Sequence, residues 1–226
     1  MELLIYYGLP ILGFIIVLAA QASITSSYKI YSKVLTKKNI TGSEVARTIL
    51  KANGLDDIYV VSVKGELTDH YDPSRKVVRL SESIYEGTSI ASFGVAAHEC
   101  GHAIQDKVGY SFMKIRTFLV PIVNLVSYLG YFGLIVSIFA GITGYLKISI
   151  LVLLASILFQ LVTLPVEFDA SKRAKQELIK LGLVTNEEAS QVSKVLTSAA
   201  LTYVASLLSN LLQLLRLVIL LGNRDD

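Results

Sequence analysis

The sequence predicts a mainly helical protein with membrane-spanning helices and a small β-sheet subdomain. Three observations lead to this fold class. Of the 226 residues, 53% are hydrophobic and 17% are charged, and the mean hydropathy of +0.57 is too high for an ordinary soluble domain. Apolar stretches near the ~20 residues that cross a bilayer recur along the chain. Helix caps and β-branched runs between them indicate a folded polar region.

Residues 3–22 form the first apolar stretch, which we predict to be a transmembrane anchor. No basic leader or convincing cleavage site accompanies it, so an uncleaved anchor is favoured over a secretory signal peptide. Basic residues follow directly, and by the positive-inside rule they place the region after residue 23 in the cytoplasm. Beside a span, their nearer partner is the anionic lipid of the bilayer, and we expect no nucleic acid. These residues are Lys29, Lys33, Lys37, Lys38, Arg47 and Lys51.

Residues 25–116 are predicted to form a cytoplasmic domain that contains a small sheet. Thr41 to Glu44 has the form of a capping box and opens a short helix that ends at Asn53-Gly54. Residues 58–63 and 76–80 carry strand signals, so we expect a sheet of two or three strands. The segment 77–80 is either an edge strand to which an extended peptide adds, or a core strand. Thr88 or Ser89 then caps a helix that runs through Asp106.

Residues 118–166 are predicted to be a transmembrane hairpin. Two apolar stretches, 118–145 and 148–166, are separated by a single charged residue, Lys147. Basic residues flank the hairpin on both sides and place both ends in the cytoplasm. They are Lys107, Lys114 and Arg116 before it and Lys172, Arg173, Lys175 and Lys180 after it.

Residues 167–226 are predicted to form the end of one helix and a second long helix. Gly182 ends the first, and a capping box from Thr185 to Glu188 opens the second toward Leu221. Polar residues recur on the second helix at steps of three and four, so it is either a fourth span with this side toward the bundle or an amphipathic helix in the interface. They are Thr202, Ser206, Ser209, Gln213 and Arg216.

The pentapeptide His98-Glu99-Cys100-Gly101-His102 has the H-E-x-x-H pattern and contains two of the three histidines of the chain. On a helix, His98 and His102 lie on one face a turn apart, where both imidazoles can bind one metal ion while Glu99 lies beside it. This pattern predicts a zincin-like active-site helix. Cys100 lies about 100° around the helix from Glu99 and about 200° from His98, so we expect it to pack rather than bind metal.

A catalytic zinc takes three protein ligands and leaves a fourth position open, so a further ligand is required. Glu167 and Asp169 follow the third span, on the same side of the membrane as the two histidines, and we choose Glu167. Two other interpretations of the histidine pair stay open: helix-face histidines held by hydrogen bonds, and a zinc-binding scaffold without activity. A transporter that uses the polar stripe of the last helix is a third.

Four segments together resemble the YugP-type neutral zinc metallopeptidases of bacteria, over almost the whole chain. These are A-A-H-E-C-G-H-A-I-Q at 96–105, D-H-Y-D-P at 69–73, V-V-R-L-S at 77–81 and L-P-V-E-F-D-A-S at 164–171. The order of anchor, H-E-x-x-H helix, hairpin and glutamate is remotely similar to HtpX and the CaaX prenyl proteases, and this resemblance implies that Glu167 is the third zinc ligand. The sequence departs from that remoter pattern at Ser171, where an aspartate that supports a zinc histidine is expected. Asp169 is a candidate substitute.

These patterns predict a membrane-embedded, gluzincin-like metalloendopeptidase with one catalytic Zn²⁺, which hydrolyses peptide bonds by a zinc-activated water with Glu99 as general base and then acid. Arg173 and Tyr203 are candidates for oxyanion stabilisation. His70 either contacts substrate or a second metal, or is a loop histidine bonded to its neighbouring aspartates. We expect a multi-pass protein of the bacterial cell membrane with its active site on the cytoplasmic side. Its expected substrates are membrane-associated proteins or peptides.

Overall fold

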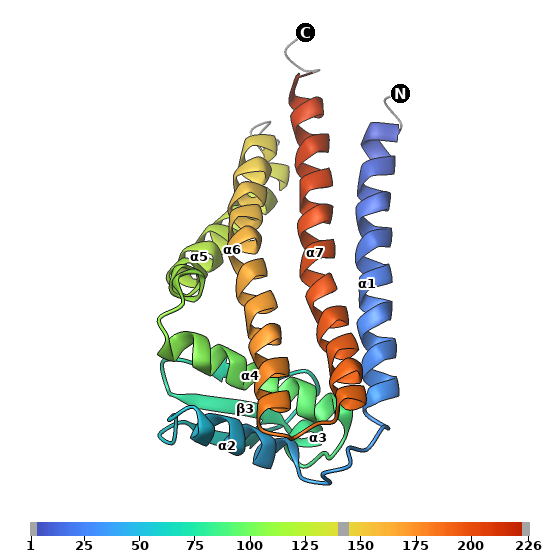
Figure 1. The fold of residues 1–226 in the computed structure, drawn as a ribbon. Coiled ribbons are helices and arrows are strands. Elements are labelled where there is room, and N and C mark those ends of the chain that lie inside the picture. Colours follow the sequence, from blue (N-terminus) through green and yellow to red (C-terminus); the bar gives the residue numbers. More distant parts are fainter. Residues whose placement is uncertain (1–3, 140–144, 223–226) are drawn as a thin grey trace. The chain divides into compact units, whose positions relative to one another are not determined.

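The computed structural model describes residues 4–139 and 145–222 and shows a mainly helical fold with one small sheet (Figure 1). The predicted fold class is therefore confirmed. A short π-helix, η1 (Leu4–Gly8), precedes the first α-helix. The α-helices are α1 (Leu9–Tyr31), α2 (Gly42–Ala52), α3 (Glu82–Tyr85), α4 (Ile90–Lys107), α5 (Ser111–Phe139), α6 (Tyr145–Lys180) and α7 (Asn186–Gly222). The strands are β1 (Tyr59–Val63), β2 (His70–Asp72) and β3 (Val77–Ser81).

The chain divides into two compact units, each built from segments that are far apart in the sequence. Residues 1–21, 114–164 and 201–226 form the first, which we call the helical unit. Residues 22–113 and 165–200 form the second, the mixed unit, which contains the sheet, α2, α3 and α4. The H-E-x-x-H helix and Glu167 belong to the same unit, because the chain returns to it after the predicted hairpin.

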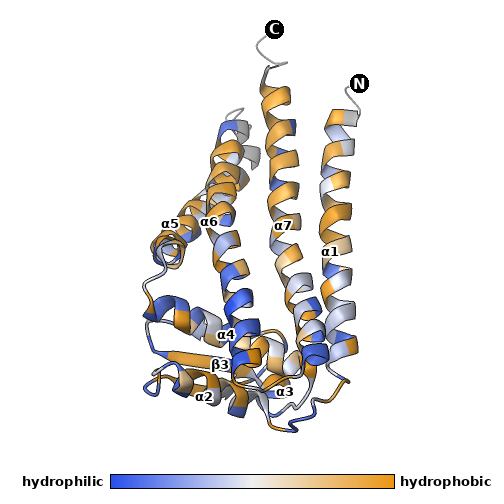
Figure 2. Ribbon diagram, viewed as in Figure 1, coloured by the Kyte–Doolittle hydropathy of each residue, from blue (hydrophilic) through white to orange (hydrophobic). Residues whose placement is uncertain are grey.

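Four helices among the described residues are long and apolar enough to cross a bilayer. They span Ile5–Tyr31, Ser111–Gly133, Lys147–Lys180 and Asn186–Gly222. Figure 2 shows apolar residues along α1, α5, the first part of α6 and the second part of α7, whereas α6 becomes hydrophilic toward its end. The first helix continues to Tyr31, past the predicted end of the anchor at residue 22.

Within the helical unit, the polar side of α7 faces neighbouring helices. Asn210 Nδ2 donates to Gln160 Oε1 of α6 over 3.2 Å, and the Arg216 guanidinium lies 5.9 Å from the centre of the Tyr6 ring. Gly13 of α1 lies so close to α7 that an added Cβ would be 2.7 Å from Ser209 Oγ. Such contacts between small and polar residues are typical of helices that pack in a bilayer, so they favour the prediction that α7 is a fourth span.

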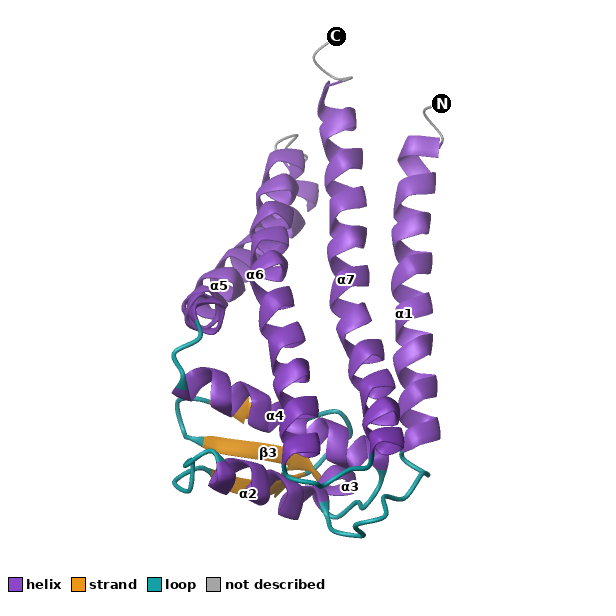
Figure 3. Ribbon diagram, in the orientation of Figure 1, coloured by secondary structure: helices purple, strands orange, loops and turns teal. Residues whose placement is uncertain are grey.

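The sheet of the mixed unit has the order β1-β3-β2, with β1 parallel and β2 antiparallel to β3. Figure 3 shows the strands in orange, with β3 labelled. Of the two interpretations of 77–80, the edge strand is therefore wrong and the core strand is confirmed, because β3 is paired on both sides. The sequence did not indicate β2, since three residues are too few for an alternating pattern to be recognised. His70, expected in a loop, lies in this strand.

The mixed unit has a hydrophobic core between α2, α4 and one face of the sheet. Ile49 of α2, Phe93 of α4 and Leu80 of β3 are among its fully buried side chains. Both predicted capping boxes are present at the starts of α2 and α7, and the Ser89 side chain caps α4. The cap and the core together fix where α4 begins and which of its faces is buried.

Candidate metal centre

Helix α4 presents His98 and His102 on one face, as the spacing predicts. Their ring centres lie 4.7 Å apart and the ring planes are inclined by 84°. His102 is buried with 6% of its surface exposed, while His98 is half-buried. Two imidazoles a helical turn apart can therefore approach one ion from two directions.

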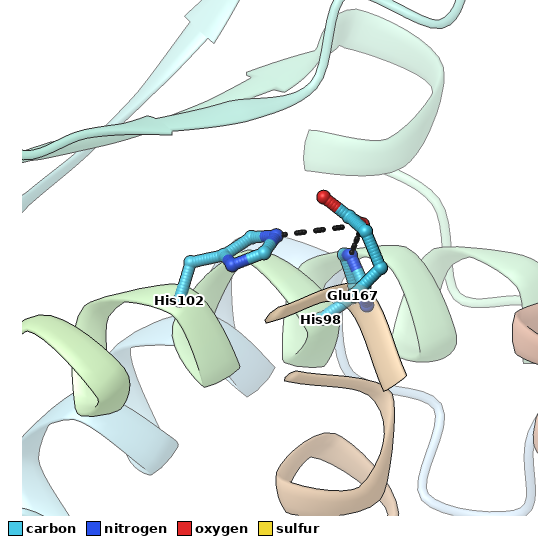
Figure 4. A group of neighbouring side chains, drawn as sticks. All are labelled: His98, His102 and Glu167. Atoms are coloured by element: carbon cyan, nitrogen blue, oxygen red, sulfur yellow. Dashed lines mark hydrogen bonds and ion pairs between the residues drawn. The ribbon is translucent and has the colours of Figure 1, made fainter. Parts of the chain in front are cut away.

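Glu167 of α6 completes a group of three possible metal ligands. Its Oε2 lies 3.2 Å from His98 Nε2 and 3.8 Å from His102 Nε2 (Figure 4). One ligand atom from each of the three residues lies within 4.8 Å of the others. Two imidazole nitrogens and one carboxylate oxygen form the donor set of a catalytic zinc site with an open fourth position. The residues present thus fit the ion that the H-E-x-x-H pattern implies.

A glycine inside the pentapeptide allows α6 to come close enough for Glu167 to reach the histidines. A Cβ built on Gly101 would lie 2.5 Å from the backbone oxygen of Ala170, which is too short for any non-bonded contact. Ala170 follows Glu167 by three residues and so lies on the same side of α6. The glycine between the two histidines therefore determines how near the carboxylate can lie.

Each histidine has a second polar contact through its other ring nitrogen. His102 Nδ1 lies 3.0 Å from Gln105 Oε1, and His98 Nδ1 lies 3.2 Å from Ser171 Oγ. Gln105 Nε2 in turn donates to Val166 O over 2.7 Å and to Asp169 Oδ2 over 2.9 Å. Sequence reasoning missed Gln105 and Ser171 as partners of the histidines. The available signal was their spacing, since Gln105 follows His102 by three residues and Ser171 follows Glu167 by four.

Glu99 is buried beside the cluster, with 7% of its surface exposed. Burial raises the pKa of its carboxyl group to about 7, and the nearby carboxylates of Glu167 and Asp69 act in the same direction. His98 and a hydrogen bond from the Tyr71 backbone N–H favour the charged form and limit this rise in pKa. The Tyr71 hydroxyl donates to Asp106 Oδ2 over 2.8 Å, which ties β2 to α4 beside Glu99.

The other predicted site residues have varied positions. Arg173 Nε donates to Asp169 Oδ2, so this guanidinium is tied to the carboxylate that Gln105 contacts. His70 is exposed, and its Nδ1 lies 2.7 Å from Thr68 O rather than against the neighbouring aspartates. Tyr203 lies on α7 in the helical unit, and its role stays a prediction. Cys100 is buried in the core with its Sγ 3.6 Å from Ala46 O, as expected for a packing residue.

Comparison with known proteins gives two matches that cover nearly the whole chain. Residues 6–222 match a family described as "Putative neutral zinc metallopeptidase". The chain is 46% identical over 208 residues to a protein of Bacillus subtilis named "Putative membrane protease YugP", and the match covers 92% of each chain. No solved structure matches this chain.

Proposed function

Since the chain belongs to this family of neutral zinc metallopeptidases, we propose that it is a membrane-embedded metalloendopeptidase whose active site is the His98, His102 and Glu167 cluster with Glu99. One observation carries the proposal. The Glu167 carboxylate of α6 contacts both histidines of the H-E-x-x-H helix. The buried carboxylate of Glu99 lies beside this cluster without occupying a ligand position. A pair of helix-face histidines held only by hydrogen bonds would not require Glu167 as a third ligand or Glu99 beside it.

The roles of the residues follow from their positions. His98, His102 and Glu167 hold one zinc ion, with both imidazoles neutral so that a nitrogen lone pair is available. When bound, zinc lowers the pKa of a water molecule toward neutrality and polarises the carbonyl group of the peptide. Glu99 accepts the proton of the attacking water and returns it to the departing amine.

We further propose that the active site lies at the cytoplasmic membrane surface and acts on membrane-associated substrates. Glu167 lies in α6 only a few residues after the apolar part of that helix. The basic residues around the candidate spans support the cytoplasmic placement by the positive-inside rule. Reconstituted enzyme should therefore cleave a membrane-tethered peptide faster than the same peptide in solution. Equal rates on the two forms would count against a membrane-proximal site.

Replacement of Glu99 by glutamine tests the proposed catalysis and separates it from an inactive zinc scaffold. The Glu99→Gln variant keeps the shape of the side chain and leaves the three ligands in place, so it should bind zinc like the wild type. It should lose peptide hydrolysis by at least about 100-fold, the lower end of general acid–base contributions. Zinc content and cleavage of casein or a fluorogenic peptide are measured on both proteins. Equal cleavage by the two would exclude Glu99 as the base.

A wild type that binds zinc but cleaves nothing would favour the scaffold. A transporter predicts solute flux that survives the Glu99→Gln substitution, and such flux measured in proteoliposomes would favour that third alternative.

A further inference from the structure

Gln105 is a fully buried amide between a candidate zinc ligand, His102, and the half-buried ion pair of Asp169 and Arg173. Its Nε2 contacts Val166 O and Asp169 Oδ2, and both of these oxygens accept hydrogen bonds but cannot donate when the carboxylate is charged. The amide nitrogen must therefore face α6 and the amide oxygen must face His102. A flipped amide would place its oxygen against two acceptors and leave both its own protons without these partners.

The direction of the amide determines which nitrogen of His102 carries the proton. Gln105 Oε1 can only accept, and His102 Nδ1 lies 3.0 Å from it, so Nδ1 must be the protonated nitrogen. In the neutral imidazole, Nε2 then carries the lone pair, and it is the nitrogen that lies 3.8 Å from Glu167 Oε2. In a neutral imidazole the hydrogen bond at one nitrogen thus selects the other for the metal.

We propose that Gln105, fixed by Asp169, is a positioning residue that holds His102 in the tautomer and orientation required to bind zinc. This inference rests on the proposed function, because it assigns a role in the same metal site. Arg173 donates to the same Oδ2 of Asp169 and holds that carboxylate in place. Gln105 thereby takes the role that an orienting carboxylate has in other zinc sites. It contacts His102 directly, while Asp169 contacts Gln105.

Ser171 cannot fix His98 in the same way. A hydroxyl both donates and accepts, so the 3.2 Å contact between Ser171 Oγ and His98 Nδ1 allows either tautomer of His98. Of the two contacts at Nδ1, only that of Gln105 with His102 therefore selects one tautomer of the ring. It also follows that loss of Gln105 should weaken metal binding more than loss of the Ser171 hydroxyl.

Zinc affinity of the full-length protein, measured by competition with a chromophoric chelator, tests the proposal. Gln105→Leu should weaken binding roughly 10- to 100-fold, the range for residues that orient a metal ligand. The matched control is Gln191→Leu in the same unit, where Gln191 Oε1 accepts no hydrogen bond and is already buried. The control should bind zinc within about twofold of the wild type, since it removes an unsatisfied oxygen rather than a partner. Equal affinities of the Gln105→Leu and Gln191→Leu proteins would overturn the proposal.

A spectroscopic measurement on the metal-free wild type tests the tautomer directly and does not depend on the folding of any variant. The chain has three histidines, so ring-¹⁵N labelling gives a spectrum that single His→Gln variants can assign. At a pH where the imidazoles are neutral, His102 should show a protonated Nδ1 and an unprotonated Nε2. A wild-type His102 protonated at Nε2 would overturn the proposal.

The two measurements also separate this proposal from the proposed function. Wild-type protein that binds no zinc but has His102 protonated at Nδ1 would contradict the metallopeptidase while supporting the role of Gln105. Wild-type protein that binds zinc with the same affinity as the Gln105→Leu variant would contradict only the role of Gln105.

Discussion

Substitution of Gly101 by alanine tests how closely α6 must approach α4 for the metal centre to form. The added Cβ would lie 2.5 Å from Ala170 O, and this backbone oxygen cannot rotate away as a side chain could. To reach the 3.4 Å at which ordinary van der Waals contact begins, the two helices must separate by roughly 0.9 Å. Zinc–ligand distances tolerate only about ±0.2 Å, so Glu167 would be carried out of reach of an ion held by the histidines.

The expected effect on stability is much smaller than the effect on metal binding. Overpacking of a close helix contact costs about 1–3 kcal/mol, while alanine in place of glycine in a helix gains about 1 kcal/mol. The metal-free Gly101→Ala protein should therefore be destabilised by no more than about 2 kcal/mol, but its zinc affinity should fall by at least about 100-fold. Thermal unfolding of metal-free protein and chelator competition measure the two quantities separately.

Gly94→Ala is the matched control, because Gly94 is a buried glycine of the same helix. Its added Cβ would lie 3.4 Å from Val192 Cγ1, an ordinary contact with a side chain that can adjust. This variant should keep the zinc affinity of the wild type and gain a little stability from helix propensity. The reasoning is refuted if Gly101→Ala binds zinc as tightly as Gly94→Ala.

Three further predictions follow from the same contacts. Glu167→Gln, which keeps the shape but removes the charge, should weaken zinc binding more than the roughly 100-fold upper range for an orienting residue, and chelator competition checks this. In the metal-free protein, burial raises the pKa of Glu99 from 4.5 to about 7, so between these pH values the folded state binds more protons than the unfolded state. The contribution of Glu99 to the free energy of unfolding should therefore fall as the pH rises from 4.5 to about 7. Denaturant titrations at several pH values should show this fall for the wild type and not for Glu99→Gln. Asn210→Leu should destabilise the protein by about 0.6 kcal/mol in detergent, because it removes the hydrogen bond to Gln160, and an unchanged midpoint of unfolding would contradict this contact.

The elements of the fold were predictable where one local pattern determines them. The capping boxes at Thr41 and Thr185 and the cap at Ser89 mark the helix starts as the structure has them, because each rests on contacts within four residues. β2 was missed because it is held by pairing with β3 and by the Tyr71 hydroxyl on Asp106, which are contacts between distant residues. The same lack of local signal left 77–80 open between an edge strand and a core strand, and only the pairing on both sides of β3 decides for the core strand.

For the candidate site, the three ligands were predictable from the sequence, whereas the groups that contact the histidines were not. The spacing of His98 and His102 required nothing beyond the geometry of a helix. The return of the chain after a hairpin narrowed the third ligand to Glu167 and Asp169, and the resemblance to HtpX and the CaaX prenyl proteases favoured Glu167, which lies beside both histidines. The partners of the histidines did not follow from the sequence, because the aspartate expected near the ligand is replaced by Ser171 and by a glutamine on another helix. A neutral amide becomes an orienting group only when its surroundings fix its direction, and those surroundings are tertiary.

The coordination of the bound metal tests the central claim most directly. X-ray absorption at the zinc edge of the loaded wild-type protein should show two imidazole nitrogens at about 2.0–2.1 Å and further oxygen ligands at about 2.0–2.2 Å, without sulfur. The Glu167→Gln protein, loaded at saturating zinc, should show altered oxygen coordination and the same two imidazoles. A sulfur ligand at about 2.3 Å, or a spectrum that the Glu167→Gln substitution leaves unchanged, would contradict the account.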